Sequence, residues 1–445
     1  MSTTDGVAIL PPGQIQINSP IIGQSNRRLQ GSGRGATTVL LKPTFVYTSA
    51  NNGAIFADAL AGFNVSDLTI DNGKIGWALA GGFGTRLNGI RHNNCSDFSV
   101  ESVTVKNASG YSFFPVGTAN TPSQTNLMTQ RAVYRDCWSY NANVHFEALR
   151  CNDILFENSH SRSGDGDIPC EAGFHPFVFG NRISFCSCSH DANGSGFLLV
   201  ASGSPLQGIV LDSCNFVSRN FRAITADSQG QQVSVLMTNS RFESLVGHGT
   251  DIGGGGGGAT WRADNCQFFG TGSSNTAGLV VGGEVDFSLV NCPASGTCSG
   301  GAATQANGAI NSNATKRITF DGELRALATG GGTAIAKGAV KILLSPNTVL
   351  NPSPLRNEAV FLEATGQVVA TNLIAGTSSQ VAITLSAACL IKTKAHLTLS
   401  LLDAAIPASS LTYSWDVTQG TPFVTAKILG NFTGKTFSYY YRELM

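Results

Sequence analysis

The chain has 445 residues, of which 42% are hydrophobic and only 13% are charged, and its formal net charge is zero. This apolar content supports a large core and excludes general disorder. A protein that coats nucleic acid needs a basic surplus to neutralise phosphates, so the charge balance argues against that class. No apolar run approaches the ~18 residues of a membrane helix, and the first residues lack the basic and apolar regions of a secretory signal. Neither a nucleic-acid partner nor membrane insertion is expected.

The N-terminal segment contains two turn motifs. Pro11–Pro12–Gly13 precedes a strand-like apolar run, and residues Leu29–Gln30–Gly31–Ser32–Gly33 have the pattern L-x-G-x-G. Along the rest of the chain, long helical periodicity is scarce, and short β-rich runs are separated by Gly, Asn, Asp and Ser. This pattern is typical of a repeat protein.

A repeat follows these motifs. Five runs that alternate apolar and variable residues before a small polar pair begin 26 residues apart, at Ile183, Ile209, Val235, Trp261 and Phe287. Looser copies begin at Phe63, Phe98, Ala132, Ile154 and Ile318. One such unit cannot bury its own inner face, so the units must stack on one another. The repeat therefore predicts a parallel β-helix of about nine turns.

Aligned on these starts, the copies form columns. The fifth residue is polar in nine copies: Asp67, Ser102, Asp136, Asn158, Ser187, Ser213, Asn239, Asn265 and Asn291. The sixth residue is most often cysteine: Cys137, Cys188, Cys214, Cys266 and Cys292. The two columns predict a tight corner repeated in register, with small side chains just inside it. These cysteines then stack as small hydrophobes, so neither a disulfide framework nor a zinc site is expected, and no cofactor is predicted.

The repeat stops near Ala326, and ATGGGTAIAKG reads as a flexible junction. Later segments alternate apolar and polar residues or run apolar, with turn residues between them. This spacing predicts a second, antiparallel β domain, most simply a sandwich. The fold class is therefore all-β, with a parallel β-helix over residues 1–325 and a sandwich-like domain over residues 326–445.

One column of the repeat gathers residues that can carry chemistry. It lies thirteen residues past successive starts and contains Tyr111, His145, Asp167, Gly196, Arg222 and His248. Because strand side chains alternate between faces, this column is expected to point outward and to line one external groove. Glu147, two residues beyond His145, is expected to share that face.

Carboxylates are dense in the same region. The insertion around SGDGDIPCEAG adds Asp165, Asp167 and Glu171 to Glu147. Hydrolysis of a glycosidic bond needs two carboxyl groups, one to donate a proton and one to activate water or attack carbon. These four residues are the catalytic candidates. The alternative for the insertion is an ordinary solvated turn, which Asp and Gly also favour.

Histidines and aromatic residues supply candidates for substrate binding. His145, His175, Arg222 and His248 extend the predicted groove, and Tyr111 and Trp138 offer rings on which sugars stack. The alternative for the aromatic pair is packing in the wall or at a subunit interface. His190 occupies a column position held elsewhere by phenylalanine, which indicates a buried structural histidine.

The distribution of lysine bears on the type of reaction. No lysine occurs between Lys106 and Lys316. A uronate lyase needs a cation or metal beside the carboxylate and a base for the C5 proton. The missing lysine favours hydrolysis over a lyase reaction on the same scaffold. A non-catalytic glycan-binding adhesin is the alternative from a different class.

The two N-terminal motifs resemble the first turns of the pectate-lyase-like superfamily, whose members are right-handed parallel β-helices. A β-helix followed by a compact C-terminal β domain resembles a bacteriophage tailspike. The resemblance implies a homotrimer in the virion tail that acts outside the host cell. It also implies binding and depolymerisation of bacterial capsule or lipopolysaccharide O-antigen. It assigns no catalytic residue, because one such fold hosts many chemistries.

Overall fold

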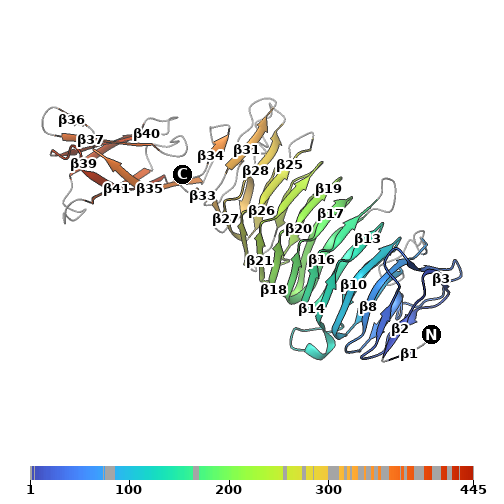
Figure 1. The fold of residues 1–445 in the computed structure, drawn as a ribbon. Coiled ribbons are helices and arrows are strands. Elements are labelled where there is room, and N and C mark those ends of the chain that lie inside the picture. The colour runs from blue at the N-terminus through green and yellow to red at the C-terminus, as the bar shows by residue number, and fades with distance from the viewer. Residues whose placement is uncertain are drawn as a thin grey trace. The chain divides into compact units, whose positions relative to one another are not determined.

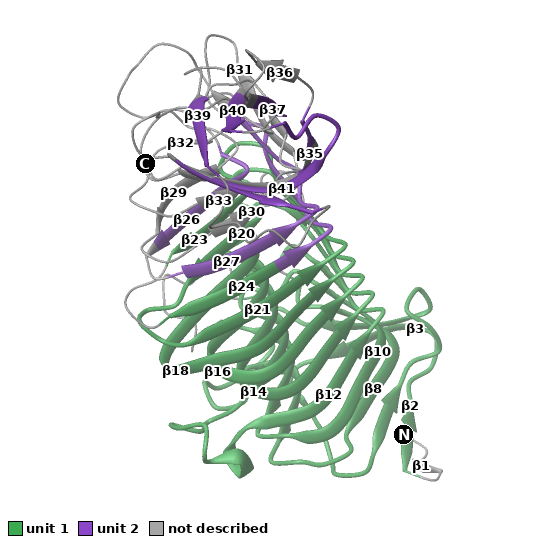
Figure 2. Ribbon diagram, turned by 90° about the vertical axis from the view of Figure 1, so that its left-hand side faces the viewer, with its two compact units in different colours: residues 1–262 green, residues 263–445 purple. Residues whose placement is uncertain are grey.

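The computed structural model describes residues 3–4, 6–73, 75, 86–163, 170–253, 258–272, 277–283 and 285–298, followed mainly by the strands of the C-terminal part. The chain divides into two compact units, residues 1–262 and 263–445 (Figure 2). Within the described residues the regular structure is β throughout, apart from one 3-10 turn at Thr125–Leu127. No described helix is long and apolar enough to cross a membrane. The predicted all-β class is confirmed.

Unit 1 is a parallel β-helix whose turns contribute to three sheets (Figure 1). The first sheet contains β5 (Arg28–Gln30), β8 (Asn64–Asp71), β10 (Ser96–Lys106), β12 (Thr129–Arg135), β14 (Val144–Glu157), β16 (Ala172–Cys186), β18 (Ser195–Asp212) and β21 (Val233–Thr238). The second sheet contains the C-terminal parts of β8 and β10 with β6 (Thr37–Leu41), β13 (Trp138–Tyr140), β15 (His160–Arg162), β17 (Ser189–Ala192), β19 (Asn215–Ser218) and β22 (Arg241–Ser244).

The third sheet of unit 1 carries most of the candidate site. It contains the N-terminal parts of β14, β16 and β18 with β4 (Ile21–Ile22), β7 (Gly53–Asp58), β9 (Asn88–Asn93), β11 (Tyr111–Val116), β20 (Ile224–Asp227) and β23 (Thr250–Gly253). The first turn is completed by β1 (Thr3–Thr4), β2 (Val7–Ile9) and β3 (Gly13–Ile17). The chain forms about 10 turns in all, close to the nine predicted.

The polar column marks a backbone corner, as the sequence predicts. All nine of its residues have a positive φ, between 47° at Asn158 and 60° at Asp67. Asn and Asp enter this left-handed region more readily than other residues with a Cβ, because their short side chains bond locally. Each corner turns the chain from the first sheet into the second. Its repetition keeps the strands of successive turns in register.

Cysteines lie directly inside this corner. The Cys188 thiol donates to the carbonyl oxygen of Phe156 at 3.4 Å, and the Cys214 thiol donates to that of Phe185 at 3.2 Å. Both acceptors belong to the preceding turn. The nine described cysteines are free thiols, and the absence of a disulfide framework stays a prediction. Burial raises the pKa of the Cys137 thiol, which keeps it protonated and uncharged.

Stacked phenylalanines fill the centre of unit 1. The rings of Phe113, Phe146 and Phe174 stack in sequence, with centroids 4.9 and 4.7 Å apart. A second stack joins Phe156 and Phe185 at 5.1 Å. Burying each such ring stabilises the fold by about 1.5–3 kcal/mol.

A small group of polar side chains also lies inside the coil. The Oγ of Ser161 lies 2.7 Å from Nδ1 of His190, which is 1% exposed, so the predicted structural role of His190 is supported. His190 pairs in strand register with Phe216 of the next turn. Burial lowers the pKa of His190 to about 4 and that of His92 to about 3. The interior histidines are therefore neutral at pH 7.

Unit 2 begins with further parallel strands. They are β25 (Gln267–Gly270), β26 (Leu279–Gly283), β27 (Val285–Val290), β28 (Ala294–Cys298), β29 (Ile310–Ala314), β30 (Ile318–Phe320), β31 (Glu323–Ala328), β32 (Ile335–Ala336), β33 (Ile342–Leu344) and β34 (Val349–Asn351). The strand β24 (Ala259–Asp264) lies at the division between the units. Parallel pairing extends to the start of β35 (Val360–Val369), and the domain boundary after residue 325 stays a prediction.

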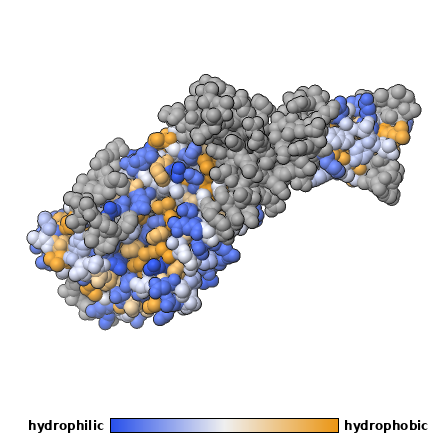
Figure 3. All heavy atoms as spheres, turned by 180° about the vertical axis from the view of Figure 1, so that it is seen from behind, coloured by the Kyte–Doolittle hydropathy of each residue, from blue (hydrophilic) through white to orange (hydrophobic). Residues whose placement is uncertain are grey.

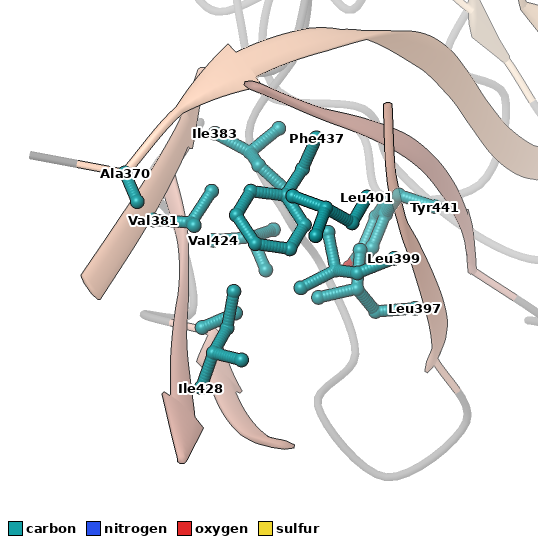
Figure 4. Packing of buried hydrophobic residues seen from close by; sticks show 11 residues of the cluster. Ala370, Val381, Ile383, Leu397, Leu399, Leu401, Val424, Ile428, Phe437 and Tyr441 are labelled. Carbon is teal, nitrogen blue, oxygen red and sulfur yellow. The ribbon is translucent and has the colours of Figure 1, made fainter. Parts of the chain in front are cut away.

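The end of unit 2 is a sandwich of two antiparallel sheets. One joins β35 and β38 (Ala395–Leu401) to β41 (Thr436–Glu443). The other contains β36 (Asn372–Ile374), β37 (Ser378–Thr384), β40 (Phe423–Leu429) and β39 (Tyr413–Val417). Buried side chains of both sheets, including Leu399, Phe437 and Val424, form one core between them (Figure 4). The predicted sandwich-like C-terminal fold is confirmed.

The cysteine arrangement predicts a low thiol reactivity. Eight of the nine described cysteines are buried and only Cys186 is half-buried, so at most three of the chain's 11 thiols are expected to react quickly in the native protein. All 11 are expected to react after denaturation. Titration with a chromogenic disulfide reagent measures both values. Several internal disulfides on a non-reducing gel would contradict the prediction.

His190 predicts a pH-dependent stability. Its pKa is about 4 in the folded chain and about 6.5 when exposed, so the free energy of unfolding falls as the pH drops from about 6.5 toward 4. At pH 5 this loss is about 2 kcal/mol for one such histidine. In His190→Phe, the decrease in unfolding free energy between pH 7.5 and pH 5 is expected to be smaller by that amount in urea denaturation. The exposed His396 provides the control, His396→Phe, and an equal change in both variants would refute the assignment.

Candidate functional site

The outer face of the third sheet presents one column of side chains in register. Successive turns align Phe56, Arg91, Phe114, Glu147, His175, Leu198, Thr225 and Asp251. The residue before several of these is a phenylalanine of the central stack, which points inward. Because neighbouring strand residues point to opposite faces, this column points away from the core.

Glu147 and His175 form the centre of the column. Nδ1 of His175 lies 2.7 Å from Oε2 of Glu147, and the two side chains are 7% and 0% exposed. Burial raises the pKa of Glu147, because the charged carboxylate loses its hydration, while His175 opposes the rise. A carboxyl group with a raised pKa is suited to donate a proton near neutral pH.

Glu171 provides a second, exposed carboxylate beside this pair. Its backbone N–H donates to the carbonyl oxygen of Asn143 at 2.7 Å, which fixes the start of β16. Its negative charge also raises the pKa of Glu147, so the two carboxyl groups lie within electrostatic range. One carboxyl group is thus buried and the other faces solvent. Such different environments separate the roles of proton donor and base.

Aromatic and cationic side chains adjoin the two carboxyl groups. The rings of Tyr111 and Phe114 stack with centroids 4.1 Å apart, and the guanidinium of Arg91 lies 5.7 Å from the Phe114 ring. Arg86 donates from Nη1 to Oδ1 of Asn143 at 2.5 Å. Burial is the main cause that raises the pKa of Tyr111, and Glu147 adds to it, so the phenol stays protonated. The face combines an apolar platform, cations and carboxyl groups.

A second polar cluster lies further along the same face. Nη1 of Arg222 lies 3.0 Å from Oδ2 of Asp251, and both act on His248, whose pKa is lowered chiefly by burial. Glu147 and Asp251 are four strand positions apart, or about 19 Å. That separation is too large for the two carboxyl groups to act on one glycosidic bond, which needs them within about 10 Å.

The position predicted for His145 is wrong. Its ring is fully buried and lies inside the coil, with Nδ1 2.6 Å from Oγ of Ser139 and the ring edge toward His190. Tyr111 pairs with Val144 and not with His145. The residue that lies thirteen positions past the start of the repeat is therefore not the register partner of Tyr111 in this turn. His145 and Phe146 both contact interior side chains, so simple alternation between faces fails at these two residues.

The other predicted residues divide between faces. The structure brings Glu171, just before β16, near Glu147, His175 and Tyr111 of the third sheet. It places Arg222 and His248 just before the later strands β20 and β23. Trp138 lies on the second sheet, where it pairs in register with Thr104 and His160. Asp165 and Asp167 lie outside the described residues. The roles of all these residues in a site stay predictions.

Sequence reasoning missed Arg86, Arg91 and Asp251. Arg91 belongs to an early turn whose spacing is irregular. Asp251 lies 16 residues past the repeat start at Val235, so it falls outside the column at thirteen residues. The usable signal for Asp251 was its nearness in sequence to His248. Among the described residues, no group of three or more His, Cys, Asp or Glu side chains is arranged to hold a metal ion.

Comparison with known proteins finds similarity only at the level of structure. No family model and no curated protein matches the sequence. Similar solved structures include phage tailspikes and other parallel β-helix proteins that act on glycans. The A-module of mannuronan C-5 epimerase AlgE6 from Azotobacter vinelandii is 16% identical with a TM-score of 0.49, over 78% of this chain and 91% of that one. The tailspike of E. coli bacteriophage HK620 is 12% identical with a TM-score of 0.46, over 99% and 87%.

A third similar structure is the catalytic domain of a GH87 alpha-1,3-glucanase in complex with nigerose. It is 13% identical with a TM-score of 0.41, over 80% of this chain and 64% of that chain. At such identities the similarity concerns the fold alone. The strand pairing of this chain itself defines the class: it is a parallel β-helix protein with a C-terminal antiparallel β domain.

Proposed function

We propose that the chain binds a bacterial surface polysaccharide, capsule or O-antigen, and cleaves it by glycoside hydrolysis. The observation that carries the proposal is the pairing of a buried carboxyl of raised pKa, Glu147, with the exposed carboxylate of Glu171. Glu147 donates a proton to the leaving oxygen, and Glu171 activates water or attacks the sugar carbon. His175 holds the Glu147 carboxyl in place. Tyr111 and Phe114 offer an apolar surface on which a sugar ring packs.

Further parts of the proposal follow the resemblance to tailspikes. Asp165 and Asp167 stay candidate carboxylates of the same insertion, and Arg222 and His248 stay candidate sugar contacts further along the face.

A lyase on this scaffold is the nearest alternative, and Arg86 and Arg91 favour it because they supply cations beside the carboxyl groups. Unsaturated products that absorb at about 235 nm distinguish a lyase from a hydrolase.

Replacement of the carboxyl groups tests the proposed chemistry. Glu147→Gln keeps the shape of the side chain but removes the proton donor, so the rate of cleavage is expected to fall about 10²–10⁴-fold. Glu171→Gln is expected to have an effect of similar size. Because the donor must be protonated, wild-type activity is expected to fall as the pH rises through the raised pKa of Glu147. Release of reducing ends from a panel of purified capsules and O-antigens, with mass spectrometry of the products, measures the rates.

Glu157 supplies the matched control. It lies on the same strand, β14, but its carboxylate pairs with Arg135 on the first sheet, at 2.6 Å between Oε2 and Nε. Glu157→Gln should retain full activity. If Glu147→Gln and Glu171→Gln both match that control, the catalytic centre lies elsewhere.

We also propose that the chain works as a homotrimer in a phage tail. Exposed apolar residues on unit 1, including Phe221, Leu245 and Val246, support association, and hydrophobic residues reach its surface in Figure 3. Light scattering is expected to give three times the chain mass of 46.4 kDa, and a chain that ends at residue 325 is expected to lose this state. A fully active monomer would refute the proposal.

A further inference from the structure

The outer face of the second sheet carries a strip of aromatic and basic side chains. Thr104, Trp138 and His160 align in successive turns. Lys106, Tyr140 and Arg162 form the next outward column, two residues further along each strand, and Asp71 precedes Lys106 in this column. Successive members of a column lie about 4.8 Å apart. Three turns therefore present rings and cations side by side.

Arg34, from the first turn, reaches across this strip. Its Nη1 donates to the carbonyl oxygen of Asp136 at 3.0 Å and lies 3.1 Å from Oδ1 of the same residue. Thr69 donates from its hydroxyl to the carbonyl oxygen of Arg34 at 2.5 Å. Trp138 donates from Nε1 to Oδ1 of Asp136 at 3.3 Å. These bonds hold the Arg34 segment over the column.

The Trp138 ring orders two guanidinium groups. Cζ of Arg34 lies 5.6 Å from the ring centroid, and Cζ of Arg162 lies 5.3 Å from it. At these distances the ring attracts a cation. Holding a long side chain before a ligand arrives reduces the entropy lost on binding.

A cavity of about 470 Å³ opens beside the strip. Its described lining consists of Arg34, Gly35, Thr69, Thr104, Lys106, Asn107, Tyr140 and Asn141. This lining includes two basic side chains, two threonines, two amides and a phenol, and it includes no carboxylate among the described residues. Neither Lys106 nor Arg162 forms an ion pair with any residue that the structure describes. The volume lies within the range of ligand sites.

We propose that this cavity and the adjoining strip bind an acidic sugar unit of a glycan. The anion, a sugar carboxylate or phosphate, lies between Lys106 and the two ordered arginines. The threonine hydroxyls and the amides of Asn107 and Asn141 match sugar hydroxyls, and Tyr140 offers a ring face. This site lies on the second sheet and is distinct from the Glu147 face on the third. It rests on the proposed role in glycan recognition but not on cleavage.

Binding of the full chain to immobilised bacterial polysaccharides tests the site. The panel contains uronate-bearing, sialate-bearing, phosphate-bearing and neutral glycans, which separates the sources of negative charge. Tighter binding of at least one acidic glycan than of the neutral ones is expected, with an affinity that weakens in 0.5 M salt. Lys106→Gln and Arg162→Gln are each expected to weaken that binding at least about tenfold, because each removes a charged hydrogen-bond donor.

Two further variants make the result decisive. Lys42 is an exposed lysine outside the cavity, so Lys42→Gln should leave the affinity unchanged. Glu147→Gln should also leave it unchanged while cleavage is lost, which separates a failure of this proposal from a failure of the proposed chemistry. The proposal is overturned if no acidic glycan binds, if neutral glycans bind equally well, if Lys106→Gln behaves like Lys42→Gln, or if a single-stranded DNA oligomer competes at equal affinity.

Discussion

One backbone constraint underlies the whole of unit 1: each turn must enter the left-handed region of φ at the same position. Asn, Asp or Ser occupies that position from Asp67 through Asn239, and the φ values stay within a narrow range. Because the bend is identical in each turn, strands pair in parallel and in register. Side chains at equivalent positions then stack, which produces the cysteine column and the phenylalanine stacks. A corner of different geometry would shift one turn and break the stacks on both sides of it.

Because equivalent positions of successive turns stack in register, residues that are far apart in sequence form continuous surfaces. Glu147 and His175 are 28 residues apart in sequence but occupy neighbouring strands, so their side chains meet. Trp138, His160 and Arg162 meet on the second sheet for the same reason. The three sheets face different directions, so one coil can present two chemically different faces. One has carboxyl groups beside aromatic rings, and the other has basic side chains beside an aromatic ring.

Loss of hydration explains the electrostatics of both the interior and the candidate site. Burial lowers the pKa of the interior His92 and His190, and it raises the pKa of the Glu147 carboxyl and of the Cys137 thiol. In each case the neutral form is favoured. The narrow interior of the coil can therefore hold polar groups in their uncharged forms. On the outer face of the third sheet, the same effect raises the pKa of the Glu147 carboxyl.

Much of the fold could be predicted from the sequence, because the corner and the columns are local and periodic. The polar column from Asp67 to Asn291, the small residues beside it and the burial of His190 all follow from a repeat of constant spacing. Turn residues and alternation were likewise sufficient to indicate the C-terminal sandwich. These features depend on residues close in sequence, or on a period that the sequence displays.

The sites depended on the tertiary structure. The turns differ in length, so the number of residues between the start of a repeat and its strand in the third sheet also differs. As a result Tyr111 pairs with Val144, and His145 points into the coil. The contact of Arg34 with Asp136, 102 residues away, does not follow the repeat period, so the sequence pattern could not predict it. The sequence by itself determined that the chain coils and where its corners lie, because each corner is a property of one residue and its neighbours. Only the tertiary structure decided which side chains share an outer face, because that depends on the summed lengths of all the segments between them.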